Sequence, residues 1–226
     1  MNSGDKNYNG VIDELVNGSW ISQTDNKQYG IPIKNIEIRK TLDGRECDLI
    51  ESLHSNQKLL VVSDPFTHKA MGSRIFKNLK AKLNVDEYIW EQPSSSIEGV
   101  QFLRTKLKDY DGMIAVGSGT VSDSIKYATF LEDKVYSVFA TTPMNAYTTG
   151  TASISFDGIK KSLVAHYAQG VFFDLEVLSN CPKRLTAAAF ADVICRTTAQ
   201  VDWLMSHKLL NTDYKTTPYE LLALYE

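Results

Sequence analysis

The chain has 226 residues, a formal net charge of −3 and 43% hydrophobic residues. This composition supports a substantial core, and it contains neither an apolar segment long enough to span a bilayer nor a basic run suited to nucleic acid or a membrane surface. Residues 1–7 lack the charged-then-apolar pattern of a secretion signal, and the three cysteines, Cys47, Cys181 and Cys195, have no paired metal-ligand spacing. We therefore expect a cytoplasmic protein with reduced cysteines.

Up to about residue 175, predicted strands alternate with predicted helices. The strands are expected at residues 31–38, 58–63, 85–90, 112–117, 135–139 and 170–173, and the helices around 47–54, 71–79, 94–110 and 120–127. Such alternation predicts an α/β fold in which a parallel sheet is covered on both faces. Residues 1–30 are uncertain apart from an amphipathic piece at Val11 to Val16.

The pattern changes after Ala140. A polar loop rich in hydroxyl groups occupies residues 141–150, and Asp157-Gly158 between apolar flanks is a hairpin signal. From Pro182 onward the sequence reads as helix, from Arg184 to about His207 in one or two pieces and then from residue 218. We predict an α/β domain over residues 1–175 and a helical region over 176–226.

The most informative stretch runs from Gly112 to Asp123. It reads as a buried strand, a Gly-x-Gly turn and the first turn of a helix, with Thr120 and Asp123 spaced as a helix-start pair. Glycines without a Cβ, followed by the free amides of a helix, favour a phosphate. A tight turn that needs glycine for steric reasons alone is the alternative at this point.

Two carboxylates also stand in informative positions. Asp64 ends a predicted strand, where it could bind ribose hydroxyls and repel a 2′-phosphate, which favours NAD over NADP; it could equally cap a helix. Because Asp64 precedes the glycine turn by about fifty residues, whereas the usual fingerprint has its acid about twenty residues after, this is not an ordinary Rossmann unit. Asp192 lies in an apolar helical stretch and requires a cation, a metal, an arginine or solvent.

Several motifs between Leu59 and Trp203 share an order and spacing. They are Gly117-Ser118-Gly119-Thr120 with Asp123, Lys126 and Tyr127, Met144 to Tyr147, Asp157 to Ser162, Phe173 to Leu178, Cys181-Pro182, Arg184-Leu185, Ala191 to Val193, and Val201 to Trp203. This set resembles the sn-glycerol-1-phosphate dehydrogenases, of the superfamily of iron-containing alcohol dehydrogenases, glycerol dehydrogenase and dehydroquinate synthase. The resemblance implies an N-terminal dinucleotide-binding domain, a helical C-terminal domain and a divalent metal, usually zinc, between them. It implies reduction of dihydroxyacetone phosphate to sn-glycerol 1-phosphate with NADH or NADPH.

The resemblance also implies roles for individual residues. By position, Gly117, Ser118, Gly119 and Thr120 would bind the pyrophosphate with Asp123 on the same turn, Asp64 the ribose, and Thr141 and Thr142 the nicotinamide side. Asn145 would face the substrate, Lys161 would assist with its phosphate, and Asp192 would be a metal ligand.

The chain departs from the family pattern in two respects. Asn145-Ala146 stands where many members have Asp-Gly, and the two histidines that complete the family's metal site on later helices are not found before the chain stops at Glu226. His207 is fifteen residues after Asp192, about 22 Å along one helix, so the two cannot share an ion on a continuous helix. His166 could approach the cleft, whereas His54 and His68 read as surface or helix-end residues.

Two alternative functions remain open from the sequence. The first is a truncated, catalytically inactive relative that binds dinucleotide or nothing. The second is a dehydroquinate-synthase-like lyase, which ranks last because Lys160, Lys161 and Arg184 supply only part of the cationic set that such a substrate needs. We also expect apolar side chains to be exposed on the helix from Leu185 to Leu204, and therefore a homo-oligomer.

Overall fold

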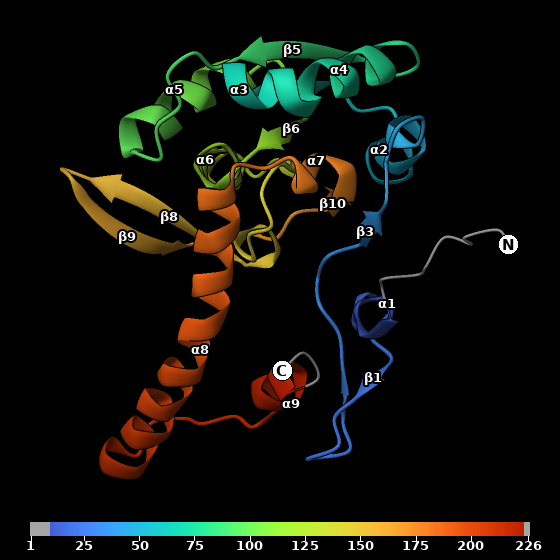
Figure 1. Cartoon of the computed structure of the whole chain (residues 1–226). Coiled ribbons are helices and arrows are strands. Elements are labelled where there is room, and N and C mark those ends of the chain that lie inside the picture. The colour runs from blue at the N-terminus through green and yellow to red at the C-terminus, as the bar shows by residue number, and fades with distance from the viewer. Residues whose placement is uncertain (1–9, 224–226) are drawn as a thin grey trace, which may run out of the picture.

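The computed structural model describes residues 10–223. The expectation that residues 1–7 carry no secretion signal therefore lies outside the described residues. Figure 1 shows an α/β body from which one long helix, α8 (Lys183–Leu210), extends away, while the last helix, α9 (Thr217–Ala223), lies on the same side of the body as the N-terminal strands. No helix in the described range is long and apolar enough to cross a membrane.

The body is built on a six-stranded sheet, which confirms the predicted α/β fold. Its order is β3 (Asn35–Arg39), β10 (Gly170–Asp174), β7 (Val135–Ala140), β6 (Gly112–Gly117), β4 (Leu59–Ser63) and β5 (Val85–Ile89). All five neighbouring pairs are parallel, with Val61 opposite Ile114 and Ile114 opposite Ser137 in the centre. The first predicted strand begins later than expected, at Asn35, because its ladder starts opposite Gly170, the first residue of the neighbouring strand β10.

Helices cover both faces of the sheet. Alternate strand residues point to opposite faces, so Val61 packs with α2 (Glu46–His54) and α4 (Ser73–Lys80). Val62 packs instead with α5 (Ile97–Leu107) and α6 (Gly119–Leu131), and α1 (Gly10–Val16) joins this second core. The continuous apolar runs of the central strands follow from this two-sided burial.

The helix predicted around Met71 to Leu79 is less regular than expected. It starts as α3 (Pro65–Thr67), widens to a π-helical segment, η1 (His68–Gly72), and continues as α4. Gly72 in that segment approaches the sheet closely, since a Cβ there would lie 3.1 Å from Oγ of Ser63.

The polar loop after β7, residues 141–150, leads into a hairpin and contains the short 3-10 helix η2 (Ala146–Thr148). We call it the β7–β8 loop. The hairpin pairs β8 (Thr151–Phe156) with β9 (Ile159–Val164), and Asp157 and Gly158 both have positive φ, at 48° and 79°, as a two-residue primed turn requires. The uncertain first segment contains a second antiparallel pair, β1 (Trp20–Ile21) with β2 (Gln28–Tyr29).

The C-terminal part is helical, as expected. α7 (Leu175–Ser179) follows β10 directly, and the helix predicted in one or two pieces is the single 28-residue α8. Among the described residues of α8, Ala189 alone is buried. The boundary between two domains at residue 175 stays a prediction.

Candidate functional site

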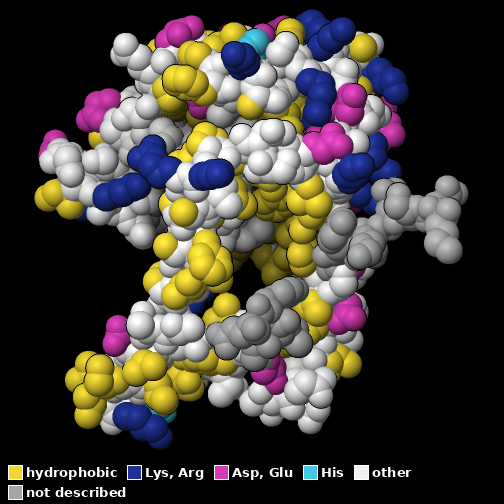
Figure 2. All heavy atoms as spheres, in the orientation of Figure 1, with side chains coloured by type: hydrophobic (Ala, Val, Ile, Leu, Met, Phe, Trp, Pro, Cys, Tyr) yellow, Lys and Arg dark blue, Asp and Glu magenta, His cyan; other side chains and the backbone are white. Residues whose placement is uncertain are grey.

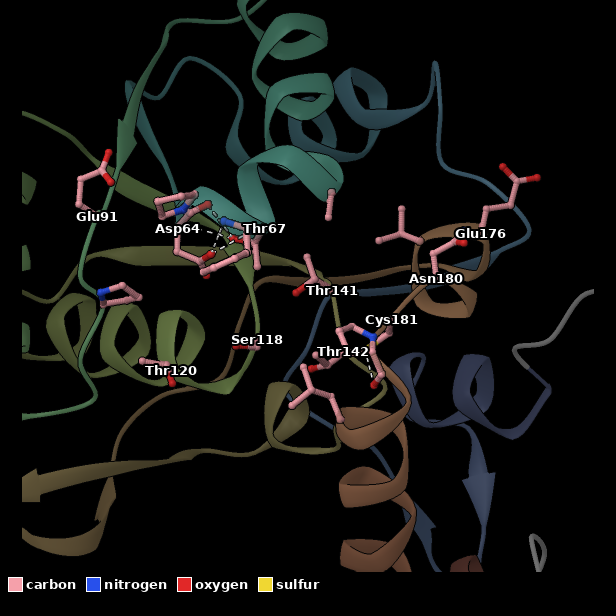
Figure 3. Close-up of a pocket in the computed structure, with 17 residues that line it drawn as sticks. Asp64, Thr67, Glu91, Ser118, Thr120, Thr141, Thr142, Glu176, Asn180 and Cys181 are labelled. Carbon is pink, nitrogen blue, oxygen red and sulfur yellow. Dashed lines mark hydrogen bonds between the residues drawn. The ribbon is translucent and has the colours of Figure 1, made fainter.

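A cavity of about 630 Å³ lies where the strands of the sheet end and α7 and α8 begin. Figure 3 shows its labelled lining, which comes from five separate parts of the chain. The lining residues are Asp64, Pro65, Phe66, Thr67, Ala70, Glu91, Pro93, Ser118, Thr120, Thr141, Thr142, Glu176, Val177, Asn180, Cys181, Pro182 and Leu185.

The topology explains why these residues meet. The strands are parallel, so the segments after β4, β6 and β7 emerge at the same edge of the sheet. The chain runs outward from β4 to β5 and then returns to β6 on the other side of β4. A ligand crevice is expected at such a switch point, outside the carboxyl ends of the strands. Asp64 and Ser118 therefore flank it.

Asp64 both caps a helix and lines the cavity. Its Oδ1 accepts hydrogen bonds from the backbone N–H groups of Phe66 (2.8 Å) and Thr67 (3.0 Å), while Thr67 Oγ1 accepts from the Asp64 N–H at 3.0 Å. Among the described residues none donates to Oδ2. The two sequence interpretations of Asp64 are thus compatible, because one oxygen serves the cap and the other remains for a ligand.

The glycine turn connects β6 to α6. The N-cap residue Ser118 has extended backbone angles and makes no side-chain cap hydrogen bond. The first intrahelical bond in this turn runs from Ser122 N–H to Ser118 O, so the amides of the preceding residues are free of helical acceptors. These amides, together with the helix dipole, favour an anion at this end of the cavity.

The two glycines of the turn differ in their surroundings. A Cβ on Gly117 would lie 2.7 Å from Cβ of Val121, so this glycine is required by the packing of α6 on β6. A Cβ on Gly119 would lie 3.4 Å from the end of the Met144 side chain, which is an ordinary contact. The steric interpretation therefore accounts for Gly117, whereas Gly119 leaves room beside the helix start.

Thr141 and Thr142 follow β7 and line the cavity. Thr141 is 7% exposed, and its Oγ1 is buried with no hydrogen-bond partner among the described residues. Thr142 Oγ1 lies 2.7 Å from the Tyr147 hydroxyl, which itself donates to Gly117 O at 3.0 Å. Thr142 therefore donates to Tyr147, and burial raises the pKa of Tyr147 so that it remains a neutral donor.

Six predicted site residues are not part of this lining: the two glycines of the turn, Asp192 on α8, and Asp123, Asn145 and Lys161. Asp123 accepts from Lys126 Nζ (3.3 Å) and from Ser153 N–H (3.1 Å), so its oxygens face the β7–β8 loop and the hairpin. Asn145 immediately precedes η2, and its buried Nδ2 has no partner among the described residues. Lys161 is exposed on β9, with Nζ 5.4 Å from the centre of the Phe156 ring.

The proposed metal ligand, Asp192, lies on α8. Its side chain is 54% exposed and pairs with Arg196 at 3.9 Å. Within residues 10–223 no group of three or more His, Cys, Asp or Glu side chains could hold a metal ion. Because α8 is one continuous helix, Asp192 and His207 cannot share an ion, and the other histidines are engaged elsewhere. His54 ends α2 as expected but is buried, and His166 bonds Thr129 at 2.9 Å.

The structure adds lining residues that the sequence did not indicate. Glu91 follows β5 by two positions, so the rule about carboxyl ends of strands could have identified it. Phe66 is 87% exposed although it is a large aromatic residue at the cavity. Cys181 and Leu185 come from α7–α8, which no local pattern places at this edge.

The charge of the lining is one-sided. Three carboxylates, those of Asp64, Glu91 and Glu176, line the cavity, and its lining includes no lysine, arginine or histidine. An anionic ligand group would therefore be bound by amides and hydroxyls near Ser118 and Thr141, away from a cationic side chain. A 2′-phosphate beside Asp64 would meet a carboxylate with no arginine to accommodate it.

Residues 37–182 match the family model described as iron-containing alcohol dehydrogenase. The chain belongs to this family. A glycerol-1-phosphate dehydrogenase [NAD(P)+] from Pyrococcus horikoshii is 32% identical over 78% of the chain and 51% of its own length. One from Bacillus subtilis is 28% identical over 83% of the chain and 50% of its own length. The chain thus spans about half the length of the curated relatives it matches.

Solved structures agree on the fold of this family. Glycerol dehydrogenase from Schizosaccharomyces pombe superposes with a TM-score of 0.64 at 18% identity, covering 72% of this chain and 42% of that one. An iron-containing alcohol dehydrogenase from Thermotoga maritima gives 0.62 at 17% identity, with 72% and 52% covered. The predicted family resemblance is confirmed.

Proposed function

We propose that the cavity at the carboxyl edge binds NAD(H), with weaker binding of NADP(H), and that the chain is the cofactor-binding part of an oxidoreductase acting on dihydroxyacetone phosphate and sn-glycerol 1-phosphate. One observation carries this: an uncapped helix start, a buried unpartnered hydroxyl on Thr141 and the Asp64 carboxylate line a single cavity. Each supplies one of the groups that a dinucleotide needs. The relatives named above support the substrate.

Each part of the cofactor has a candidate partner. The amides at Ser118, Gly119 and Thr120 would bind the diphosphate, and Oδ2 of Asp64 would accept from ribose hydroxyls. Thr141 Oγ1, which lacks a partner, would hydrogen-bond at the nicotinamide side. The reduced nicotinamide supplies the hydride to the ketone carbon, so the protein's contribution is orientation and exclusion of water.

The metal that the family implies does not fit the described residues. Asp192 is a single exposed carboxylate paired with Arg196, whereas a catalytic zinc takes three protein ligands. No step of the reaction is therefore derived through a metal. Zinc binding at Asp192, substrate contact by Asn145 and phosphate binding by Lys161 stay predictions, as do the cytoplasmic location and a homo-oligomeric state.

The same observation favours a second candidate, dinucleotide binding without turnover. The residues that would bind the dinucleotide all line one cavity, whereas α8 presents Asp192 to solvent. The two candidates differ in catalysis but agree on binding.

Calorimetric titration with NADH and NADPH, followed by measured NADH oxidation with dihydroxyacetone phosphate and zinc, tests both. We expect NADH to bind roughly tenfold more tightly than NADPH, because the 2′-phosphate of NADPH would lie beside the Asp64 carboxylate. Asp64→Asn keeps an efficient helix cap and should narrow this preference. Binding without turnover selects the second candidate, and absence of binding to either nucleotide contradicts the proposal.

A further inference from the structure

Lys126 is a fully buried cation two turns into α6 and is not part of the cavity lining. Its Nζ lies within hydrogen-bond distance of four oxygens: Ala146 O (2.7 Å), Thr151 O (2.9 Å), Asp123 Oδ1 (3.3 Å) and Thr149 Oγ1 (3.3 Å). An ammonium group has three donors, so it is saturated by these acceptors. Three of the four belong to the β7–β8 loop or the first residue of β8.

Asp123 completes this connection on the other side. Its Oδ1 accepts from Lys126, and its Oδ2 accepts from the N–H of Ser153 in β8. Both side chains therefore tie the second half of the β7–β8 loop and the start of the hairpin to α6. The amides of the first turn of α6 are the groups proposed to bind the diphosphate.

The first half of the same loop lines the cavity. Tyr147, whose neighbour Ala146 is bound by Lys126, is fully buried and joins Thr142 to Gly117 O through its hydroxyl. A displacement of Ala146 would thus be transmitted through Tyr147 to Thr142 and Thr141. Asp64 and Glu91 belong to other strand ends, and Figure 3 shows Glu91 on the far side of Ser118 from the two threonines.

We infer that the Asp123–Lys126 pair positions Thr141 and Thr142 for the nicotinamide half of the cofactor. The inference rests on the proposed function. Lys126 is a positioning residue and not a catalytic one, because it reaches the cavity through the β7–β8 loop. Its loss should weaken ligands that need the two threonines and spare ligands that need only the helix start and Asp64.

The test compares NADH with ADP, which carries the adenosine and diphosphate but no nicotinamide. Lys126→Met keeps the length of the buried stem and removes the ammonium. We expect the dissociation constant for NADH to rise roughly tenfold, as for loss of one hydrogen bond to a charged group, while that for ADP changes by less than about twofold. The ratio of the two constants is the measurement, since a merely structural role would change the melting temperature but not the ratio.

Lys134→Met is the matched control. Lys134 Nζ also donates to backbone carbonyls, those of Leu107 (2.9 Å), Lys108 (3.3 Å) and Tyr110 (2.6 Å), but it precedes β7 at the opposite edge of the sheet. Its loss should lower stability and leave the NADH-to-ADP ratio unchanged. If Lys126→Met does not fold, Tyr147→Phe removes the linking hydroxyl, keeps the buried ring and should shift the ratio in the same direction.

The outcomes separate the inference from the proposed function. A wild-type chain that binds both ligands, with variants at Lys126 and Tyr147 that weaken both equally or neither, overturns the positioning role alone. A wild-type chain that binds neither ADP nor NADH overturns the proposed function, and the inference falls with it.

Discussion

Apolar side chains are buried in the α/β body but largely exposed along helix α8. In the body, leucines and valines of the strands and of α4, α5 and α6 are removed from solvent in two cores. Along α8, eight large apolar side chains are exposed among the described residues, and Figure 2 shows hydrophobic atoms along this part of the molecule. They are Phe190, Val193, Ile194, Val201, Leu204, Met205, Leu209 and Leu210.

This difference indicates that the α/β body is stabilised by its own packing, whereas α8 buries little apolar surface within the described residues. The far end of α8 is held by an aromatic cluster in which the Trp203 ring lies 5.1 Å from Tyr214 and 6.2 Å from Tyr219. Trp203 Nε1 also donates to Asp213 O at 2.6 Å. These contacts pack the C-terminal tail against the helix but leave most of the apolar side chains of α8 exposed, whereas those of the body are buried.

Truncation of one leucine in each region tests this contrast most strongly. Leu103 in α5 is 0% exposed and Leu209 in α8 is 74% exposed. Leu103→Ala should lower the free energy of unfolding by about 2–5 kcal/mol because it leaves a cavity in a packed core. Leu209→Ala should change it by less than about 0.5 kcal/mol. Equal losses in urea unfolding would mean that α8 is packed as firmly as the body.

Alanine at each glycine of the turn gives the next largest effect. Gly117→Ala would force its Cβ against Val121 and should cost about 1–3 kcal/mol of stability by overpacking. Gly119→Ala meets only the flexible end of Met144 and should be close to neutral in stability. Thermal unfolding of both variants distinguishes them, and a Gly119→Ala variant as unstable as Gly117→Ala would contradict the described packing.

Self-association is expected to depend on the open surface of α8. Replacing Phe190 and Leu209 together by serine should raise the dissociation constant of the oligomer roughly tenfold, because exposed apolar area is removed from both ends of this surface. Ile159→Ser, which changes an exposed residue of the hairpin, is the control and should have little effect. Sedimentation velocity measures this, and a monomeric wild-type chain at high concentration would refute the expectation.

The smallest effect concerns pH and should arise in the body. Burial lowers the pKa of His54 from its usual 6.5, and the ring bonds Gln57 (2.8 Å) and Ser137 (2.7 Å). The folded state therefore binds the proton less readily than the unfolded chain. The stabilisation is complete above pH 6.5 and declines as pH falls from there toward the lowered pKa of the folded state.

Urea unfolding between pH 7.5 and 5.5 should show this decline in the wild-type chain. His166, whose pKa is also lowered by burial, contributes with the same sign. A variant with His54→Asn and His166→Asn should lose most of the dependence in this interval. If the free energy of unfolding of the variant depends on pH as strongly as that of the wild-type chain, groups other than these two histidines cause the dependence.

The contrast between the regions also limits what the sequence could predict. Strands and helices of the body were located within a few residues, because continuous apolar runs and turn residues are local signals. Two features were not located from the sequence. The π-helical segment before Ser73 depends on its close approach to Ser63, and the later start of β3 depends on the neighbouring strand β10. The cap on Asp64 could be read from Asp-Pro, but its second role required the fold.

The residues of the site that directly follow a strand could be predicted from the sequence. Ser118, Thr120, Thr141 and Thr142 were named from the sequence and do line the cavity. The motif that includes Asp123 gave no indication that its carboxylate faces away, because that orientation depends on Lys126 and on Ser153, thirty residues later. Contacts from distant segments are beyond local patterns.

The most direct test of the central claim is calorimetric titration of ADP into the wild-type chain and a Ser118→Asp variant. Asp is an efficient N-cap, and Ser118 makes no side-chain cap bond, so α6 should be equally or more stable in the variant. The new carboxylate would occupy the amides proposed to bind the diphosphate and would repel it. We predict one ADP bound per wild-type chain and affinity roughly a hundredfold weaker in the variant, with an unchanged or higher melting temperature. Equal affinity in both proteins would contradict diphosphate binding at the start of α6.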